Sequence, residues 1–428
     1  MNHAIRHVAL GAGVLAAGML AACAGNHTAG QNDFTTVLPA HDLPGYAAIQ
    51  HGRYLVKAGD CKACHTAPGG KPFAGGRAVP TPFGIIYSTN ITPDPATGIG
   101  KWSEADFYHA MHTGTARDGH HLYPAFPYPW YTKVTSNDVR DIKAYLGTLP
   151  PVRQRNLPTE LPWPFSMRST MAVWNKLYFD EGTFKGDPKE SAAWNRGAYL
   201  VRGLGHCGAC HSPKNFAGAV KQSDALHGGH AEHAFAPALT GGLRDGLGGW
   251  SANEIVGYLK TGSNDKSSAA GPMAEVVTNS TQYLSDADLH AIATYLKAQP
   301  HPKSGEQTGR PDKNLMTLGG DVYADDCTAC HMDHGQGLAR VFPPLKGSSA
   351  IQAANADTLI RVVLGGADVP ATQSRPTGLK MPAFNDKLDD AQIAALLTYI
   401  RNAWGNHASA VSNSEVAKMR KQMEHGHG

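Results

Sequence analysis

The fold of this chain is decided by one short stretch, Cys61-Lys62-Ala63-Cys64-His65. The same pattern returns at Cys207-Gly208-Ala209-Cys210-His211 and at Cys327-Thr328-Ala329-Cys330-His331, so the three copies use six of the seven cysteines. Cys-x-x-Cys-His is the attachment signature of c-type haem: two thiols on one helical turn form thioethers with the porphyrin, and the following imidazole binds the iron. The sequence therefore predicts three covalently bound haem c groups. Their attachment residues are the cysteine pairs Cys61/Cys64, Cys207/Cys210 and Cys327/Cys330, and their proximal iron ligands are His65, His211 and His331.

Two other uses of a Cys-x-x-Cys pair are disfavoured by the surrounding sequence. A tetrahedral zinc site needs four ligands, and none of the three motifs has another cysteine close by. A thioredoxin-like dithiol would leave the histidine after each pair without a role. A motif that recurs three times in a chain with almost no other cysteine indicates an electron carrier.

Length and composition bound the remaining possibilities. A chain of 428 residues holds two to four domains, and three haem motifs favour three. The net charge of +3 gives no basic field of the kind that binds nucleic acid. With 48 Gly, 28 Pro and 17% charged residues, the chain is rich in loops but globular. We expect an all-α fold of three tandem class I cytochrome c domains joined by Pro-rich linkers.

The N-terminal residues 1–23 have the features of an export signal. Arg6 supplies a positive charge, and residues 8–22 form an apolar stretch that is short for a membrane span. Leu20-Ala21-Ala22-Cys23 resembles the cleavage site of bacterial lipoproteins, which predicts acylation of Cys23. The alternative is an ordinary cleavage site that leaves Cys23 without a function. The first interpretation places an exported, lipid-anchored protein on the periplasmic side of the cytoplasmic membrane.

Repeated phrases divide the rest of the chain into three units. Gly52-Arg53-Tyr54-Leu55 and Gly197-Ala198-Tyr199-Leu200 each precede a motif. Each unit then ends in a helix with apolar residues at helical spacing, and Ser103, Ser251 and Ser285 stand where helix N-caps belong. The expected divisions are domains at 45–150, 191–300 and 312–404, a Pro-rich linker at 151–190 with a helix near Trp174, a second linker around Pro302, and a polar tail at 405–428.

A low-spin electron-transfer haem needs a sixth ligand, and methionine is a common one. Met273, in Gly271-Pro272-Met273, and Met381, in Lys380-Met381-Pro382, each precede the last helix of their unit. We expect them to bind the second and third iron on the distal side; the alternative is that they fill the core. The carbonyls of Pro68, Pro213 and Pro343 or Pro344 are candidates to orient the proximal histidines.

The first unit breaks this pattern. Its loop reads His121-Leu122-Tyr123-Pro124-Ala125-Phe126, and alignment with the other units puts Phe126 or Tyr123 at the ligand position. Met111 lies nearby, but its place on a helix favours a core role. His121, or less favourably His120, is the candidate distal ligand. The alternative is a five-coordinate iron that binds a small molecule.

Three phrases around the first motif resemble a known family. They are Tyr87-Ser88-Thr89-Asn90-Ile91-Thr92-Pro93-Asp94, Gly98-Ile99-Gly100-Lys101-Trp102 and Leu122-Tyr123-Pro124-Ala125-Phe126-Pro127-Tyr128. With the three motifs, they make the chain similar to the tri-haem cytochrome c subunit of membrane-bound dehydrogenases in acetic acid bacteria and related proteobacteria. Many members carry Met where Phe126 stands here.

That resemblance implies a function and partners. The partner is a catalytic dehydrogenase subunit with PQQ, a flavin or molybdenum, accompanied in some complexes by a small chaperone-like subunit. Electrons then pass to ubiquinone or to a terminal oxidase at the membrane surface. This chain itself has no flavin or nicotinamide fingerprint and no phosphate loop. Two rival functions stay open: a self-contained haem peroxidase or reductase that uses an open first haem, and a cytochrome subunit of a terminal oxidase.

Overall fold

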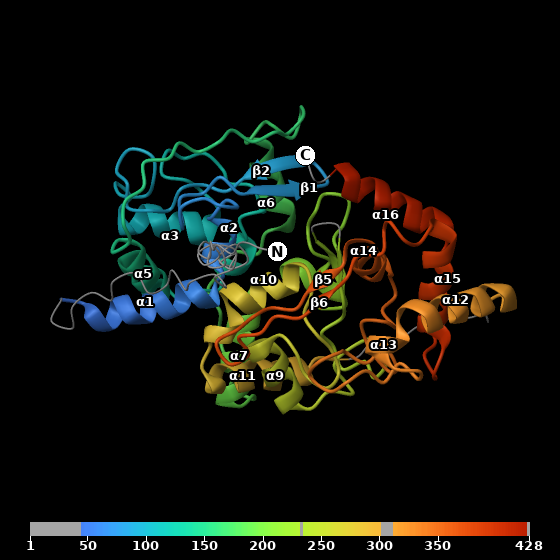
Figure 1. Cartoon of the computed structure of the whole chain (residues 1–428). Coiled ribbons are helices and arrows are strands. Elements are labelled where there is room, and N and C mark those ends of the chain that lie inside the picture. The colour runs from blue at the N-terminus through green and yellow to red at the C-terminus, as the bar shows by residue number, and fades with distance from the viewer. Residues whose placement is uncertain (1–43, 232–233, 301–310, 426–428) are drawn as a thin grey trace, which may run out of the picture. The chain divides into compact units, whose positions relative to one another are not determined.

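The structure is a computed structural model that describes residues 44–231, 234–300 and 311–425 (Figure 1). Its regular structure is mostly helical. The expected export signal and Cys23 lie outside the described residues. Within those residues, no helix combines the length and the apolar character that crossing a membrane requires.

Three pairs of helices form the frame, and each pair joins the helix before a motif to the last helix of the same unit. Directly after the first helix of each pair comes the short turn that carries the motif. The pairs are α1 (Tyr46–Ala58) with α5 (Ser136–Leu146), α7 (Ala192–Arg202) with α11 (Asp286–Lys297), and α12 (Lys313–Asp326) with α15 (Asp390–Asn402). The motif turns are α2 (Cys61–Cys64), α8 (Gly208–His211) and α13 (Thr328–His331).

A glycine lies at the crossing point of each helix pair. A Cβ atom on Gly52 would lie 1.8 Å from the carbonyl oxygen of Asp141, and one on Gly197 would lie 1.9 Å from that of Ala291. In the third pair, a Cβ on Gly319 would lie 2.1 Å from the carbonyl oxygen of Ala395. No real Cβ tolerates such distances, so the two backbones meet directly at the crossing. The same packing therefore recurs in all three pairs.

The middle helices begin and end where the sequence predicts. Ser103 caps α3 (Glu104–Thr113) and Ser251 caps α9 (Ala252–Thr261), each in a capping box that satisfies two backbone N–H groups. Gly114 and Gly262 end these helices with φ of 64° and 75°, the left-handed region that favours glycine. Ser285 caps α11, as expected. In the third unit this place belongs to α14 (Asp357–Gly365).

Three antiparallel hairpins depart from the all-α expectation. They are β1 (Ala78–Thr81) with β2 (Gly84–Tyr87), β3 (Gly229–Ala231) with β4 (Ala234–Ala236), and β5 (Ala367–Asp368) with β6 (Lys380–Met381). Each strand has two to four residues, too few for alternation of apolar and polar residues to reveal it. The first two hairpins matter for the haem sites below.

The segment between the first and second helix pairs forms hydrogen bonds to residues of both the first and the second unit. It contains α6 (Thr170–Tyr178), near the expected Trp174. The Trp174 indole N–H donates to the Ala217 carbonyl at 2.9 Å, in the second unit. The Tyr128 hydroxyl donates to Asn175 Oδ1 at 2.5 Å, from the first unit. This linker therefore packs against neighbouring structure, as its aromatic residues indicate.

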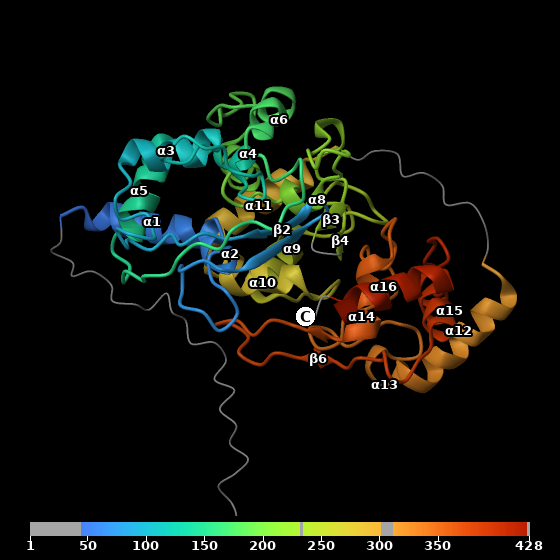
Figure 2. The ribbon, with the colours of Figure 1, turned by 90° about the horizontal axis from the view of Figure 1, so that it is seen from above.

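The third helix pair has a fully buried core. The predicted apolar face of α15 is inside, with Ile393, Leu396 and Leu397 at most 2% exposed. The tail at 405–428, expected to be polar and superficial, contributes α16 (Asn413–His425), which packs beside α14 and α15 (Figure 2). Val416 and Met419 of α16 are buried. The sequence did not predict this contact, because α16 has few apolar residues among many charged ones.

The remaining elements are short helices that lie between those already described. They are α4 (Tyr128–Tyr131), α10 (Pro272–Asn279), and the 3-10 helices η2 (Gln222–Asp224) and η3 (Thr281–Tyr283).

Candidate haem sites

Each motif presents two thiols and an imidazole on one helical turn. Burial raises the pKa of Cys61, Cys207 and Cys327 to about 12, and for Cys61 the nearby charges of Asp60 and Cys64 add to the effect. A redox or metal-binding thiolate has a lowered pKa instead. The first cysteine of each motif therefore lacks the properties of an activated thiolate.

The three motif histidines are held in the same way. The Nδ1 atoms of His65, His211 and His331 lie 2.6, 2.7 and 3.0 Å from the backbone carbonyl oxygens of Thr89, Pro237 and Pro343. Each carbonyl accepts a hydrogen bond from the Nδ1–H group, which fixes the tautomer of the ring and leaves the Nε2 lone pair for a metal. Burial lowers the pKa of all three histidines, which favours the neutral ring that ligation needs. These residues fit haem c, whose iron supplies a one-electron couple when bound.

Two of the three predictions of the carbonyl that orients a motif histidine are wrong. Thr89 holds His65 in place of Pro68, and Pro237 holds His211 in place of Pro213; Pro343 is confirmed for His331. The reason is the pair of hairpins that the sequence did not reveal. Thr89 follows β2 and Pro237 follows β4, so each hairpin brings a distant carbonyl back to the imidazole.

A repeat in the sequence could have found both carbonyls. Thr89 and Pro237 each stand three residues before a threonine, Thr92 and Thr240. The carbonyls of these threonines accept from the backbone N–H groups of Ile99 and Leu247, at 2.9 and 2.7 Å. Ile99 and Leu247 stand three residues before the tryptophans that precede Ser103 and Ser251. Alignment of the first two units on those tryptophans therefore brings the two carbonyls into register.

The two candidate distal methionines lie on different kinds of element. Met273 is half-buried in the first turn of α10. Helix α10 also contacts α2, the turn of the first motif (Figure 2), and its Glu275 pairs with Arg77 at 2.8 Å. Met381 pairs with Ala367 in the β5–β6 hairpin and packs against the third core. Met273 thus belongs to a helix that touches the neighbouring haem motif.

The loop of the first unit has the turn that precedes Met273 in the second unit. The backbone N–H of Leu122 donates to the Gly114 carbonyl at 2.7 Å, and that of Ala269 donates to the Gly262 carbonyl at the same distance. Counting onward from these equivalent bonds puts Phe126 at the position of Met273. Of the two positions left open, the turn favours Phe126 over Tyr123.

The two histidines of this loop differ in their contacts. His120 Nδ1 lies 2.5 Å from the Asp118 carboxylate, so this ring already has a partner. His121 Nδ1 is buried and has no hydrogen-bond partner among the described residues. The His121 carbonyl accepts from the Arg168 guanidinium at 2.9 Å, which ties this part of the loop to the linker. Between the two, His121 is the better candidate for a metal ligand.

A buried histidine that sequence reasoning missed has a structural explanation. His112 on α3 is 2% exposed, its ring stacks on Tyr108 at 4.0 Å, and its Nε2 has no partner among the described residues. Burial lowers the pKa of His112, and a hydrogen bond to the backbone of Val134 opposes that shift. In the second unit, Lys260 takes the same place and donates to the Leu284 carbonyl at 2.8 Å. Both side chains tie the middle helix to the residue before the cap of the last helix. Met111 beside it is buried, as expected for core.

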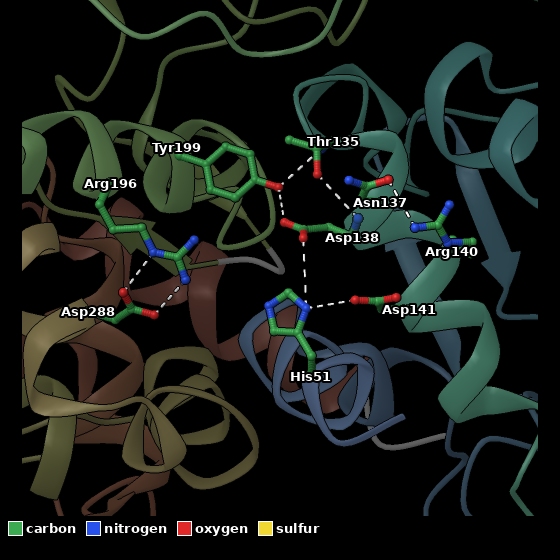
Figure 3. A network of polar contacts seen from close by, with 9 residues as sticks. All are labelled: His51, Thr135, Asn137, Asp138, Arg140, Asp141, Arg196, Tyr199 and Asp288. Carbon is green, nitrogen blue, oxygen red and sulfur yellow. Dashed lines mark hydrogen bonds and ion pairs between the residues drawn. The ribbon is translucent and has the colours of Figure 1, made fainter. Parts of the chain in front are cut away.

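The first two helix pairs exchange tyrosine hydroxyls. Tyr54 on α1 donates to the Asp288 carboxylate on α11 at 2.5 Å, and Tyr199 on α7 donates to the Asp138 carboxylate on α5. The same two hydroxyls accept from the backbone N–H groups of Ser285 and Thr135, at 3.2 and 3.1 Å. Figure 3 shows Tyr199 reaching across to Asp138 and Thr135. Each unit therefore completes the start of the other unit's last helix.

Charged groups surround both exchanged carboxylates (Figure 3). Arg196 forms two bonds of 2.7 Å to Asp288, and His51 Nδ1 lies 4.0 Å from Asp138 and 2.8 Å from Asp141. Although burial opposes the shift, the hydrogen bonds from Arg196 and Tyr54 lower the pKa of Asp288. The contact between the two units is thus a bonded, partly ionic one.

Comparison with known proteins agrees with these features. The family model for cytochrome c matches residues 49–150 and 316–404. The gluconate 2-dehydrogenase cytochrome c subunit of Pantoea cypripedii is 40% identical over 407 residues, covering 89% of this chain and 91% of that protein. The cytochrome c subunit of the quinone-dependent alcohol dehydrogenase of Gluconacetobacter polyoxogenes is 40% identical over 394 residues, covering 87% and 84%. The fructose dehydrogenase cytochrome subunit of Gluconobacter japonicus is 37% identical over 416 residues, covering 89% and 85%.

These similarities extend over nearly the whole length of both partners in each comparison, and the family model covers the first and third motif turns. The chain therefore belongs to the family of cytochrome c subunits of gluconate, alcohol and fructose dehydrogenases, which carry covalently bound haem c.

Proposed function

We propose that this protein is a tri-haem electron-transfer subunit that takes electrons from a catalytic dehydrogenase subunit and passes them to ubiquinone or a terminal oxidase. The observation that carries the proposal is the threefold repetition of one arrangement. Each motif turn follows a helix that crosses the last helix of its unit at a glycine. The Nδ1–H group of each motif histidine donates a hydrogen bond to a backbone carbonyl. Three haem-attachment sites in one chain favour a relay of electrons over a single reaction centre.

The same proposal assigns the iron ligands. The proximal ligands are His65, His211 and His331, and the cysteine pairs of the motifs form the thioethers. Met273 and Met381 are the distal ligands of the second and third haem. For the first haem we assign His121, because its Nδ1 is buried and has no hydrogen-bond partner in the part of the chain that the structure describes, while His120 is engaged by Asp118. Imidazole on both sides lowers the potential of that haem relative to a His/Met site.

The relatives support a dehydrogenase as the partner. The gluconate, alcohol and fructose dehydrogenase subunits named above are each cytochrome subunits of a dehydrogenase. Under this proposal, substrate oxidation takes place in a separate catalytic subunit with PQQ, a flavin or molybdenum, with or without a small chaperone-like subunit. This chain supplies the haem sites and their spacing. Cys23 anchors it by acyl chains to the periplasmic face of the cytoplasmic membrane.

Co-purification and rapid mixing test the main proposal. The chain expressed with its neighbouring genes and isolated from membranes should bring down a large dehydrogenase subunit. Addition of that subunit's substrate should then reduce the haems of this chain within one turnover of the enzyme. A dehydrogenase that turns over its substrate while the co-purified haems stay oxidised would refute the assignment.

Ligand-binding spectra separate the proposal from a self-contained haem enzyme. If His121 binds the first iron, the oxidised protein is entirely low-spin and does not change on addition of cyanide or peroxide, and the reduced protein does not bind CO. His121→Ala then creates one high-spin haem that binds CO, whereas His120→Ala, the matched control, does not. A wild-type protein that binds CO or consumes peroxide at one haem would support the open-haem alternative.

The lipid anchor has its own test. Cys23→Ser should release the protein from membranes in a strain that lacks the catalytic partner, while the haem content is retained. Membrane association that persists in this variant would place the attachment elsewhere in the chain.

A further inference from the structure

The residues that precede the first and the second motif turn lie against each other, and short elements that the sequence did not single out contribute to this contact. Leu204 Cδ2 lies 3.4 Å from the position that a Cβ on Gly59 would take, so the residues before the two motifs are packed together. Helix α4 of the first unit and helix α10 of the second unit fill the two sides of this contact. Each of them belongs to one unit and touches the motif turn of the other.

Helix α4 joins the two motifs through its last two residues. The hydroxyl of the buried Tyr131 donates to the Gly59 carbonyl at 3.1 Å, two residues before Cys61. The Tyr131 ring centroid lies 5.7 Å from that of His206, with 37° between the planes, and His206 is the residue before Cys207. Trp130 Nε1 lies 3.2 Å from the position of a Cβ on Gly208, inside the second motif. One short helix thus contacts the attachment turns of two haems.

The opposite side of the contact is built by α10 and η3. The Ser280 hydroxyl donates to the Ala58 carbonyl at 3.4 Å, and the Lys57 ammonium lies 4.2 Å from the Tyr283 ring centroid. With the pair Arg77–Glu275, these contacts hold the second unit against the first motif. They are polar contacts between backbone, hydroxyl and charged groups. The Tyr131–His206 pair is the part of the contact in which two aromatic rings meet across the units.

We propose that the Tyr131 and His206 rings form the route by which electrons pass between the haem of the first motif and the haem of the second. Tyr131 is the positioning residue of this pair, because its hydroxyl fixes the ring on the Gly59 carbonyl. This inference rests on the proposed function, since it requires haem at both motifs. The transfer moves one electron: one haem iron is oxidised, the other is reduced, no bond forms or breaks, and neither ring changes its oxidation state.

The physical basis is the continuity of packed atoms. Electronic coupling between two sites is weaker across a gap than through atoms in contact, and a cavity leaves its lining without partners. The chain from Cys61 to Gly59 is covalent, as is the bond between His206 and Cys207. The hydrogen bond of Tyr131 and the contact of the two rings join these covalent pieces. Removal of the Tyr131 ring therefore interrupts the route at its centre.

Injection of one electron into the oxidised full-length protein tests this inference. A pulse of radiolytic reductant reduces one haem, and redistribution between the first and second haem is then followed by absorbance. The first haem has no methionine at the Phe126 position, so its spectrum is separable from the other two. Tyr131→Leu, which removes both the hydrogen bond and the ring contact, should slow this redistribution several-fold. Tyr131→Phe, which loses only the hydrogen bond to Gly59, should slow it less.

Tyr323 offers a matched control. It is also a buried tyrosine, and its hydroxyl donates to a carbonyl beside a motif, that of Met332, at 2.6 Å. Its ring contacts are Tyr399 and Trp404, both of the third unit. Tyr323→Leu should therefore leave the exchange between the first two haems unchanged.

The outcomes separate the route from folding and from the proposed function. Tyr131→Leu with three haems per chain and an exchange rate equal to wild type would overturn the inference. If Tyr131→Leu loses haem, His206→Ala takes over the test: it leaves Tyr131 in place, and an unchanged rate in it overturns the inference equally. Because the electron is injected directly, no dehydrogenase is needed. A wild-type chain that exchanges electrons internally but accepts none from a dehydrogenase would contradict the proposed function and leave the route intact.

Discussion

The glycine at each helix crossing is the feature of this fold that a single methyl group tests best. Gly197→Ala adds a Cβ on α7 at a point 1.9 Å from the Ala291 carbonyl oxygen and 2.8 Å from the Tyr295 Cβ. Ordinary contact begins at 3.4 Å. The two helices must therefore move apart by roughly 1.5 Å, because both nearest atoms are backbone or directly attached to it.

The expected effect is large for so small a change. Overpacking of a core costs about 1–3 kcal/mol, and a clash with backbone falls at the upper end of this range. A loss of about 3 kcal/mol lowers the melting temperature of a unit of about 110 residues by roughly 13 °C. The separated helices also move the second motif turn, so we expect a lower haem content in the second unit before unfolding.

A second glycine of the same unit provides the control. Gly257 lies within α9, and a Cβ there would meet no atom within 4 Å. Gly257→Ala should stabilise the protein by about 0.5–1 kcal/mol, since alanine loses less backbone entropy in a helix. Calorimetry of the haem-loaded full-length variants measures both effects. A melting temperature of Gly197→Ala equal to or above that of Gly257→Ala would refute the account of the crossing.

Other predictions concern the contact between units and the iron ligands. Tyr54→Phe removes the hydroxyl bonded to Asp288 and should cost about 1.5–3 kcal/mol, measured by calorimetry; a change below the error of the instrument would show that the exchange does not hold the units together. The pKa of Asp288 is lowered, so its stabilising contribution is present above the unfolded pKa of about 3.9 and is lost as the pH falls through the lower folded pKa. Acid titration of the melting temperature should show this loss in wild type and a smaller one in Asp288→Asn; equal acid sensitivity in both would contradict it. Met381→Leu should open one coordination position and produce one CO-binding haem, and a spectrum unchanged by CO would exclude Met381 as a ligand.

Sequence was most informative where a local rule acts. The motif turns, the caps at Ser103, Ser251 and Ser285, and the glycine ends of α3 and α9 all depend on a few adjacent residues. The repeat of Gly52-Arg53-Tyr54-Leu55 and Gly197-Ala198-Tyr199-Leu200 marked two of the helices that precede a motif, but it did not reveal that these glycines lie at helix crossings. In the third unit the following tyrosine, Tyr323, stands four residues after Gly319 instead of two, so the repeat is not visible there.

Patterns in the sequence did not predict contacts between residues that are far apart in the chain. The carbonyls that hold His65 and His211 arrive by hairpins of three or four residues per strand, too short to leave a periodic signal. The exchange of Tyr54 and Tyr199 depends on how two units face each other, which no local propensity encodes. The contact of Tyr131 with His206 has the same origin. In each case the sequence shows which residues can form such a contact, but it does not show which distant residue each of them contacts.

The number of electrons that one chain accepts tests the central claim most directly. Coulometric titration of the purified full-length protein, followed by haem absorbance, should end at three electrons per chain. Replacement of the cysteine pair of any one motif by alanine should lower this number to two. A wild-type value of two, or a value that does not fall when one motif is removed, would contradict the account of three haem-bearing units.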